Sequence, residues 1–360
     1  MQLKMSSCKT VAGVWTRLFE EDPIGDDASA DKTTLVLWTQ APASGIYVDI
    51  RLPLKSPGRS DTTDCAARKP SPSSLRATKG ALSKDYDLSI LTAQKSFAGV
   101  LTFKEGDTSD PPGVALAKDT VLADLVKDSN AALPLCTCFW RRDVDMQPPS
   151  GGLDIGVCAS YSPQAADGTV DLRETGDDGS YAEGWRRMGN THQGPFLALE
   201  LVSENGHART GYWVRTGHRF AYAVGRPTSV ENAQALGCVD KSCSVKDQVG
   251  KTLAEAVSDM KSNGDEDILL DVIGSYVAVA GEITADNGAW KILDSTNPGL
   301  VHCYLVGAEL EKDEVNCSTL RCDSKDVKEG DTIDQVVRGD GAFVRKWKVV
   351  EMSGCLVPFL

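Results

Sequence analysis

Hydrophobic and polar residues alternate along much of this chain with a period of two, which predicts β-strands because successive strand side chains point to opposite faces. The clearest example is the segment 46–52. Its aliphatic positions are Ile46, Val48, Ile50 and Leu52, and its polar positions are Tyr47, Asp49 and Arg51. If both faces of this strand are shielded from water, the acid and the base must pair with each other or with a bound molecule.

Similar patterns, bounded by turn-forming Gly, Pro, Asn and Asp, predict many further strands. They lie at 13–15, 33–38, 97–103, 135–144, 154–161, 169–174, 181–187, 195–204, 208–216, 219–225, 268–284, 290–293, 302–310 and 342–350. Short helices are predicted at 88–94, 119–127, 229–236 and 247–260. The segments 53–83, 104–113 and 311–341 are polar and rich in turn residues, which predicts loops or insertions.

This succession of strands predicts a mainly β fold of two tandem antiparallel β-barrels with short helical insertions. A sandwich explains the pattern less well, because amphipathic strands recur without the Cys-Trp-Cys signature of that fold. A break near 189–194 separates the halves. We therefore expect a first barrel at 8–190 with a surface loop at 53–83, and a second barrel at 191–360 with a helical insertion at 228–264.

The charge balance narrows the choice of partners. The chain has 360 residues and a formal net charge of −13, which disfavours both nucleic acid and anionic membranes. No apolar run approaches about 18 residues, so no stable membrane insertion is expected. The first eight residues lack the apolar core of a secretory signal, and 11 scattered cysteines are typical of free thiols in a reducing compartment. These features predict a soluble, cytoplasmic protein.

An ordered series of short motifs carries a family resemblance. The motifs include Gly13-Val-Trp15, Tyr47-Val-Asp-Ile-Arg51, Phe97-Ala-Gly99, Trp140-Arg-Arg-Asp143, Asp154-Ile-Gly156, Glu174-Thr-Gly176, Tyr181-Ala-Glu-Gly-Trp-Arg186 and Gly211-Tyr-Trp-Val-Arg-Thr-Gly217. In the order of these motifs, the chain resembles the lipocalin-like two-barrel family known from a yeast casein-kinase-interacting protein. Bacterial and algal relatives of that family are expected. The resemblance covers 11–227 well and the last third loosely. It implies two calycin-type barrels and supplies no catalytic residues to carry over.

Three strand segments place charged residues beside aromatic ones, and their polar faces form the candidate ligand-binding site. The candidate residues are Tyr47, Asp49, Arg51, Trp140, Arg142, Tyr181, Glu183 and Trp185. One interpretation is a surface or structural network of ion pairs. The other is a set of groups facing a cavity, in which an arginine holds the carboxylate of a ligand.

Strand parity refines this set. It places Tyr181, Glu183 and Trp185 on one face of their strand. In the segment 138–145 it places Trp140 beside Arg142, and the opposite face then carries Arg141, Asp143 and Asp145. One of these two faces is expected to meet solvent.

Neither a metal site nor a cofactor is predicted. The cysteine pairs are Cys136/Cys138, Cys238/Cys243 and Cys317/Cys322, and none has the Cys-x₂-Cys spacing typical of zinc. Free thiols are the preferred interpretation, with disulfides as the alternative. Only His218, beside Arg219, is considered for a pocket among the histidines. A Gly-x-Ser-x-Gly elbow and a phosphate-binding loop are missing from the sequence.

Three kinds of function remain open. The leading hypothesis is a binding protein for a small amphipathic or hydrophobic molecule, such as a fatty acid, isoprenoid or tetrapyrrole, with Arg51, Arg142 or Arg219 at its polar end. The second is a scaffold with inert barrels that recruits a protein partner such as a kinase. The third is a cofactor-independent isomerase, cyclase or lyase, in which Glu183, Asp49 or Tyr181 transfers a proton.

Overall fold

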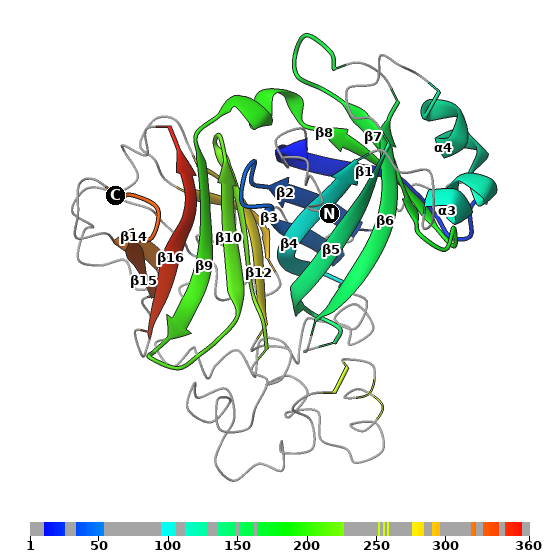
Figure 1. Cartoon of the computed structure of the whole chain (residues 1–360). Helices are drawn as coiled ribbons and strands as arrows, with labels where there is room; N and C mark the ends of the chain where they lie inside the picture. The colour runs from blue at the N-terminus through cyan, green and yellow to red at the C-terminus, as the bar shows by residue number, and fades with distance from the viewer. Residues whose placement is uncertain are drawn as a thin grey trace, which may run out of the picture.

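The structure is a computed structural model and confirms the mainly β fold. It describes residues 11–25, 34–53, 95–105, 112–127, 135–148, 151–161, 164–226, 251–252, 255, 258, 276–283, 290–295, 318–321, 327–337 and 343–354. A closed eight-stranded barrel is followed by an eight-stranded antiparallel sheet (Figure 1). No helix in these ranges is long and apolar enough to cross a membrane.

The first barrel is a simple meander in which each strand pairs antiparallel with the next and β8 closes onto β1. Its strands are β1 (Gly13–Glu21), β2 (Thr34–Gln40), β3 (Ile46–Pro53), β4 (Phe97–Glu105), β5 (Cys136–Asp145), β6 (Gly152–Ser160), β7 (Asp171–Gly176) and β8 (Ala182–Arg187). The short 3₁₀ helix η3 (Gly189–Gln193) then leads into the second sheet. The domain boundaries at 190 and 191 stay predictions.

The second sheet has the strand order β13-β12-β11-β10-β9-β16-β15-β14. Its strands are β9 (Phe196–Glu204), β10 (Gly211–Thr216), β11 (Arg219–Val224), β12 (Val277–Ile283), β13 (Trp290–Ser295), β14 (Ser318–Arg321), β15 (Thr332–Val337) and β16 (Phe343–Ser353). The predicted second barrel corresponds to this sheet, in which β13 and β14 are the end strands among the residues described.

Some elements differ from the sequence prediction. The predicted turn-rich segment 311–341 contains β14 and β15. In β15 the alternation is obscured because an amide, Gln335, takes an inward position, where it accepts a hydrogen bond from the Trp347 indole at 3.0 Å. The predicted loop 53–83, apart from Pro53, and the predicted elements at 88–94, 229–236 and 302–310 lie outside the described residues, as does most of the helical insertion at 228–264.

Two short helices, α3 (Pro112–Lys118) and α4 (Thr120–Leu125), cover the outside of the barrel at β6 and β7 (Figure 1). The helix predicted at 119–127 corresponds to α4, and α3 was not predicted. The side chain of Asp119 caps α4 by accepting the backbone N–H of Leu122 at 3.0 Å. The same carboxylate accepts hydrogen bonds from Arg173 and Thr175, each at 2.6 Å. Arg173 and Thr175, on the outward face of β7, therefore hold the start of α4.

Both faces of β3 are buried, as the alternation in the sequence suggested. Its aliphatic residues, Ile46, Val48 and Ile50, point out of the barrel and join one apolar cluster with Ala221 and Ala223 of the second sheet. Figure 1 shows the barrel and the sheet lying side by side at this contact. The polar face of β3 points into the barrel. Because both faces are largely shielded from bulk water, the charges on β3 need partners inside the barrel.

Candidate functional site

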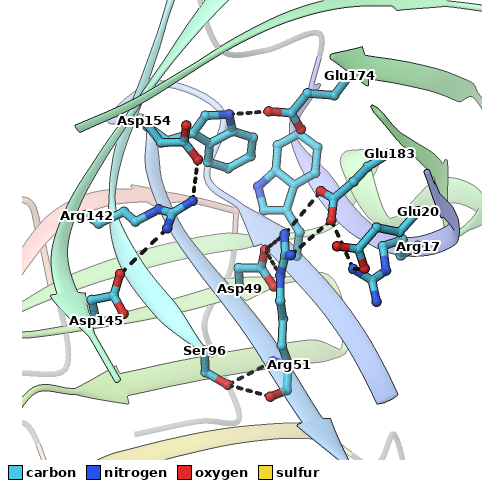
Figure 2. Close-up of polar contacts among 12 residues, drawn as sticks. Arg17, Glu20, Asp49, Arg51, Ser96, Arg142, Asp145, Asp154, Glu174 and Glu183 are labelled. Carbon is cyan, nitrogen blue, oxygen red and sulfur yellow. Dashed lines mark hydrogen bonds and ion pairs between the residues drawn. The ribbon is translucent and has the colours of Figure 1, made fainter. Parts of the chain in front are cut away.

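The charged groups of β3 and β8 meet inside the barrel (Figure 2). The guanidinium of Arg51 donates to Asp49 Oδ2 from Nε at 3.1 Å and from Nη2 at 3.0 Å. It also donates to Glu183, from Nη1 at 2.9 Å and from Nη2 at 3.2 Å. Since β8 pairs with β1 and β7 and not with β3, this contact spans the barrel interior. The predicted ion-pair network therefore exists, and it crosses the lumen.

A second guanidinium shares Glu183. Arg17 of β1 donates to Glu183 Oε1 at 3.0 Å and pairs with Glu20 at 2.5 Å. Burial opposes the ionisation of Glu183, but the positive charges of Arg51 and Arg17 outweigh it, so the pKa of Glu183 lies below its usual value. This carboxylate is therefore ionised and fully engaged at neutral pH.

Asp49 differs from Glu183 in both its pKa and its hydrogen bonds. Burial raises the pKa of Asp49, and the attraction of Arg51 offsets that effect only in part. Its Oδ2 atom takes both hydrogen bonds from Arg51, while its Oδ1 atom is buried and has no hydrogen-bond partner among the described residues. A buried acceptor without a partner costs free energy. Asp49 therefore has one oxygen available to a donor that enters the barrel.

Glu174 of β7 lies in the barrel without an arginine. Its Oε1 atom accepts the indole N–H of Trp140 at 2.6 Å and the thiol of Cys138 at 3.7 Å. Burial raises the pKa of Glu174 to about 8, and the negative charges of Glu183 and Asp154 add to the effect. The carboxyl group is thus mostly protonated at pH 7 and ionises close to physiological pH.

Arg142 of β5 occupies another part of the same space. It pairs with Asp154 of β6 and lies 3.7 Å from Asp145, as Figure 2 shows. Its guanidinium carbon also stands 4.1 Å from the centre of the Phe97 ring.

The parity prediction for β5 was wrong at Asp145, which was expected opposite Arg142. A β-bulge shifts the register of β4 against β5, so that Ala98 faces Val144 while Gly99 faces Arg142. The extra residue moves Asp145 to the cavity side. The bulge depends on a glycine, because a Cβ at Gly99 would stand 1.8 Å from the carbonyl oxygen of Arg141. Of the opposite face, Arg141 is exposed and pairs with Asp143 at 2.9 Å.

These side chains line a cavity of about 280 Å³. The lining residues predicted from the sequence are Asp49, Arg51, Trp140, Arg142, Tyr181 and Glu183. The lining residues that were not predicted are Glu20, Asp22, Lys95, Phe97, Asp145, Gln147, Pro148, Asp154 and Glu174. The site is therefore larger and more acidic than the sequence indicated.

Tyr47 and Trp185, the other two predicted residues, belong to the aromatic core next to the cavity. The Tyr47 ring packs edge-on against Trp140 at a centroid distance of 4.9 Å. Trp185 packs edge-on against Trp38 at 5.6 Å, and the guanidinium of Arg51 lies 5.7 Å from the Trp185 ring centre. Both residues are fully buried. They hold the lining side chains in place and do not themselves line the cavity.

Other candidates lie away from this cavity. His218 is exposed in the turn between β10 and β11, so the pocket considered for it was wrong. Arg219 pairs with Glu282 of the neighbouring strand at 2.5 Å. The thiols of Cys136, Cys138 and Cys158 are free and buried, whereas the other two predicted pairs fall outside the described residues. No three His, Cys, Asp or Glu side chains in the described ranges are arranged to hold a metal ion.

Comparisons with known proteins add little to this geometry. No protein-family model matches the chain, and no curated protein matches it in sequence. A solved crystal structure, that of the uncharacterized protein YLR301w from Saccharomyces cerevisiae, is similar over 95% of this chain and 98% of that chain, with 12% sequence identity and a TM-score of 0.41. A likeness of this size does not establish a shared family or function. The resemblance to the lipocalin-like two-barrel family therefore stays a prediction.

Proposed function

We propose that this protein binds a small amphipathic molecule, whose polar end enters the cavity of the first barrel. The observation that carries this proposal is the cavity itself, in which charged groups and aromatic rings line one space that opens to the outside. Its volume lies just below the range for ligand pockets, roughly 300–1,000 Å³. The cavity therefore suits a small ligand, or one end of a longer ligand.

The cost of the buried charges supports the same proposal. Asp49 is 1% exposed and Glu183 is 3% exposed. A buried ion network is generally no more stable than well-packed apolar residues of similar volume. Ionisable groups with shifted pKa values also cluster at functional sites. Charges kept at this expense, in the lining of a cavity, favour a binding role over an inert barrel.

The alternative functions stay predictions. For the enzyme hypothesis, the acids named from the sequence are poorly suited, because Glu183 is held by two guanidiniums and Asp49 by one. Glu174, with a pKa of about 8, is the better proton donor or acceptor. Recruitment of a protein partner and a cytoplasmic location are likewise predictions.

The proposal is tested by looking for a bound molecule. Native mass spectrometry of freshly purified protein should show an added mass that solvent extraction releases. Lys95 is exposed and lines the cavity, so a bulky ring there should cover the opening without removing a buried group. We expect Lys95→Trp to lower the occupied fraction at least about fivefold, which corresponds to roughly 1 kcal/mol of binding free energy.

Lys346→Trp is the matched control, because Lys346 is exposed on β16 of the second sheet. It should leave the occupied fraction unchanged. Binding that survives in Lys95→Trp would place the ligand elsewhere. A purified protein with no added mass, whose tryptophan fluorescence is not quenched by fatty acids, isoprenoids, tetrapyrroles or amines, would contradict the proposal.

A further inference from the structure

The cavity is strongly acidic. Among the described residues that line it, seven carry carboxyl groups and three carry cationic side chains. An acidic, partly buried space repels an anion and attracts a cation. Net charge alone does not define a site, because charged groups that are paired with one another are less available to a ligand.

The two arginines of the cavity already have carboxylate partners within the protein. Arg51 uses Nε, Nη1 and Nη2 on Asp49 and Glu183. Arg142 is paired with Asp154 and approaches Asp145. A ligand carboxylate would therefore compete with protein carboxylates for either guanidinium. The expectation from the sequence that an arginine holds an acidic ligand is not favoured by this arrangement.

Two carboxyl groups in the cavity, in contrast, can still accept a hydrogen bond from a ligand. The buried Oδ1 atom of Asp49 has no partner in the described part of the chain. Glu174 is 4% exposed and forms no ion pair with any described residue, since its contacts are the Trp140 indole and the Cys138 thiol. Both side chains line the cavity. The space thus offers acceptor oxygens to a donor. Its guanidiniums already have carboxylate partners, although the buried Nε of Arg142 has no hydrogen-bond partner in the described part of the chain.

We infer that the polar end of the ligand is an organic cation with N–H donors, such as a primary ammonium group, and that Glu174 receives it. This inference rests on the proposed function and specifies its ligand class. The Asp49 Oδ1 atom is a second acceptor for the same group. The rings of Trp140 and Tyr181 in the lining provide aromatic surface beside a cation. A metal ion fits less well, because no suitable set of three ligands exists in the described ranges.

Binding of such a cation should release a proton. The groups that act on Glu174 are Cys138 and Trp140 of β5, Asp154 and Cys158 of β6, Tyr181 and Glu183 at β8, and Arg51 of β3. Together with burial they keep the pKa of Glu174 at about 8, so the free protein carries this proton at pH 7. A cation beside the carboxyl group favours its ionised form, and the proton then leaves.

Three probes with one alkyl chain test the charge preference: octylamine, 1-octanol and octanoate. Isothermal titration calorimetry at pH 7, in buffers of different ionisation enthalpy, measures both the affinity and the protons released. We expect octylamine to bind at least about tenfold more tightly than 1-octanol, octanoate to bind most weakly, and octylamine alone to release close to one proton. Its affinity should rise from about pH 6.5 to about pH 8.5, because Glu174 ionises over that range.

Glu174→Gln should remove both the proton release and the pH dependence, and it should bring octylamine close to 1-octanol. Glu200→Gln, an equal change at an exposed position of β9, should behave as the wild type. Octanoate or 1-octanol binding as tightly as octylamine would overturn the inference and leave the proposed function standing. Failure of all three probes, together with no molecule recovered from the purified protein, would overturn both. The wild-type pH series tests the inference even if Glu174→Gln does not fold.

Discussion

Replacing Arg51 with methionine should cost about 3–5 kcal/mol of unfolding free energy, or prevent folding altogether. The guanidinium of Arg51 is the shared partner of Asp49 and Glu183, which are both nearly inaccessible to water. Methionine has a similar length but no charge, so it would leave two buried carboxylates without their main donor. Urea denaturation followed by tryptophan fluorescence measures the loss.

Two control variants distinguish the loss of the buried ion pairs from a nonspecific effect of replacing arginine with methionine. Arg141→Met removes the same group from an exposed position of β5, where Arg141 is paired with Asp143, and it should cost less than about 1 kcal/mol. The triple variant Arg51→Met, Asp49→Asn, Glu183→Gln removes the buried charges with their partner, and it should recover part of the loss. Stability of Arg51→Met within about 1 kcal/mol of the wild type would show that the pairs are not buried as described.

The second large effect concerns Glu174 and pH. Its folded pKa of about 8 lies above the ordinary value of 4.5, so the folded state binds the proton more strongly than the unfolded state does. Stability from this group is present below about pH 4.5 and is lost as the pH rises towards 8. Glu174→Gln keeps an acceptor for the Trp140 indole and does not titrate. The variant should therefore become increasingly more stable than the wild type over this range, by about 2–5 kcal/mol at pH 8.5.

Urea denaturation at several pH values between about 4.5 and 9 gives this difference directly. Glu200→Gln, at the exposed position on β9, should show no such growth. A Glu174→Gln variant whose stability follows the wild type in parallel across the whole range would mean that Glu174 titrates normally, and therefore that it is not buried in the barrel.

Strand periodicity predicted the centre of the site well. The alternation at 46–52 separated an apolar face from a polar one, and the structure buries the first against the second sheet and the second in the barrel. The shared face of Tyr181, Glu183 and Trp185 is likewise inside. A period of two is enough for such assignments wherever a strand is regular.

Other parts of the site depend on information that local pattern does not contain. Asp145 entered the cavity through a β-bulge that Gly99 permits, and parity arguments fail across a bulge. Glu174 was missed although it alternates with the buried Leu172 on β7, a signal that was available. The carboxylates that pair with Arg51 and Arg142 include Glu183 and Asp154, which lie on other strands. No local pattern specifies which groups remain unpaired.

The central claim is that a neutral Glu174, bonded to Trp140, lies in a cavity that receives a ligand. NMR of the indole N–H groups tests it most directly, with the Trp140 signal assigned by Trp140→Phe. We predict that this signal titrates near pH 8 and moves when octylamine is added, while the signals of Trp213 and Trp347, in the second sheet, stay in place. A Trp140 signal that neither titrates between about pH 6 and 9 nor responds to the amine would contradict the account.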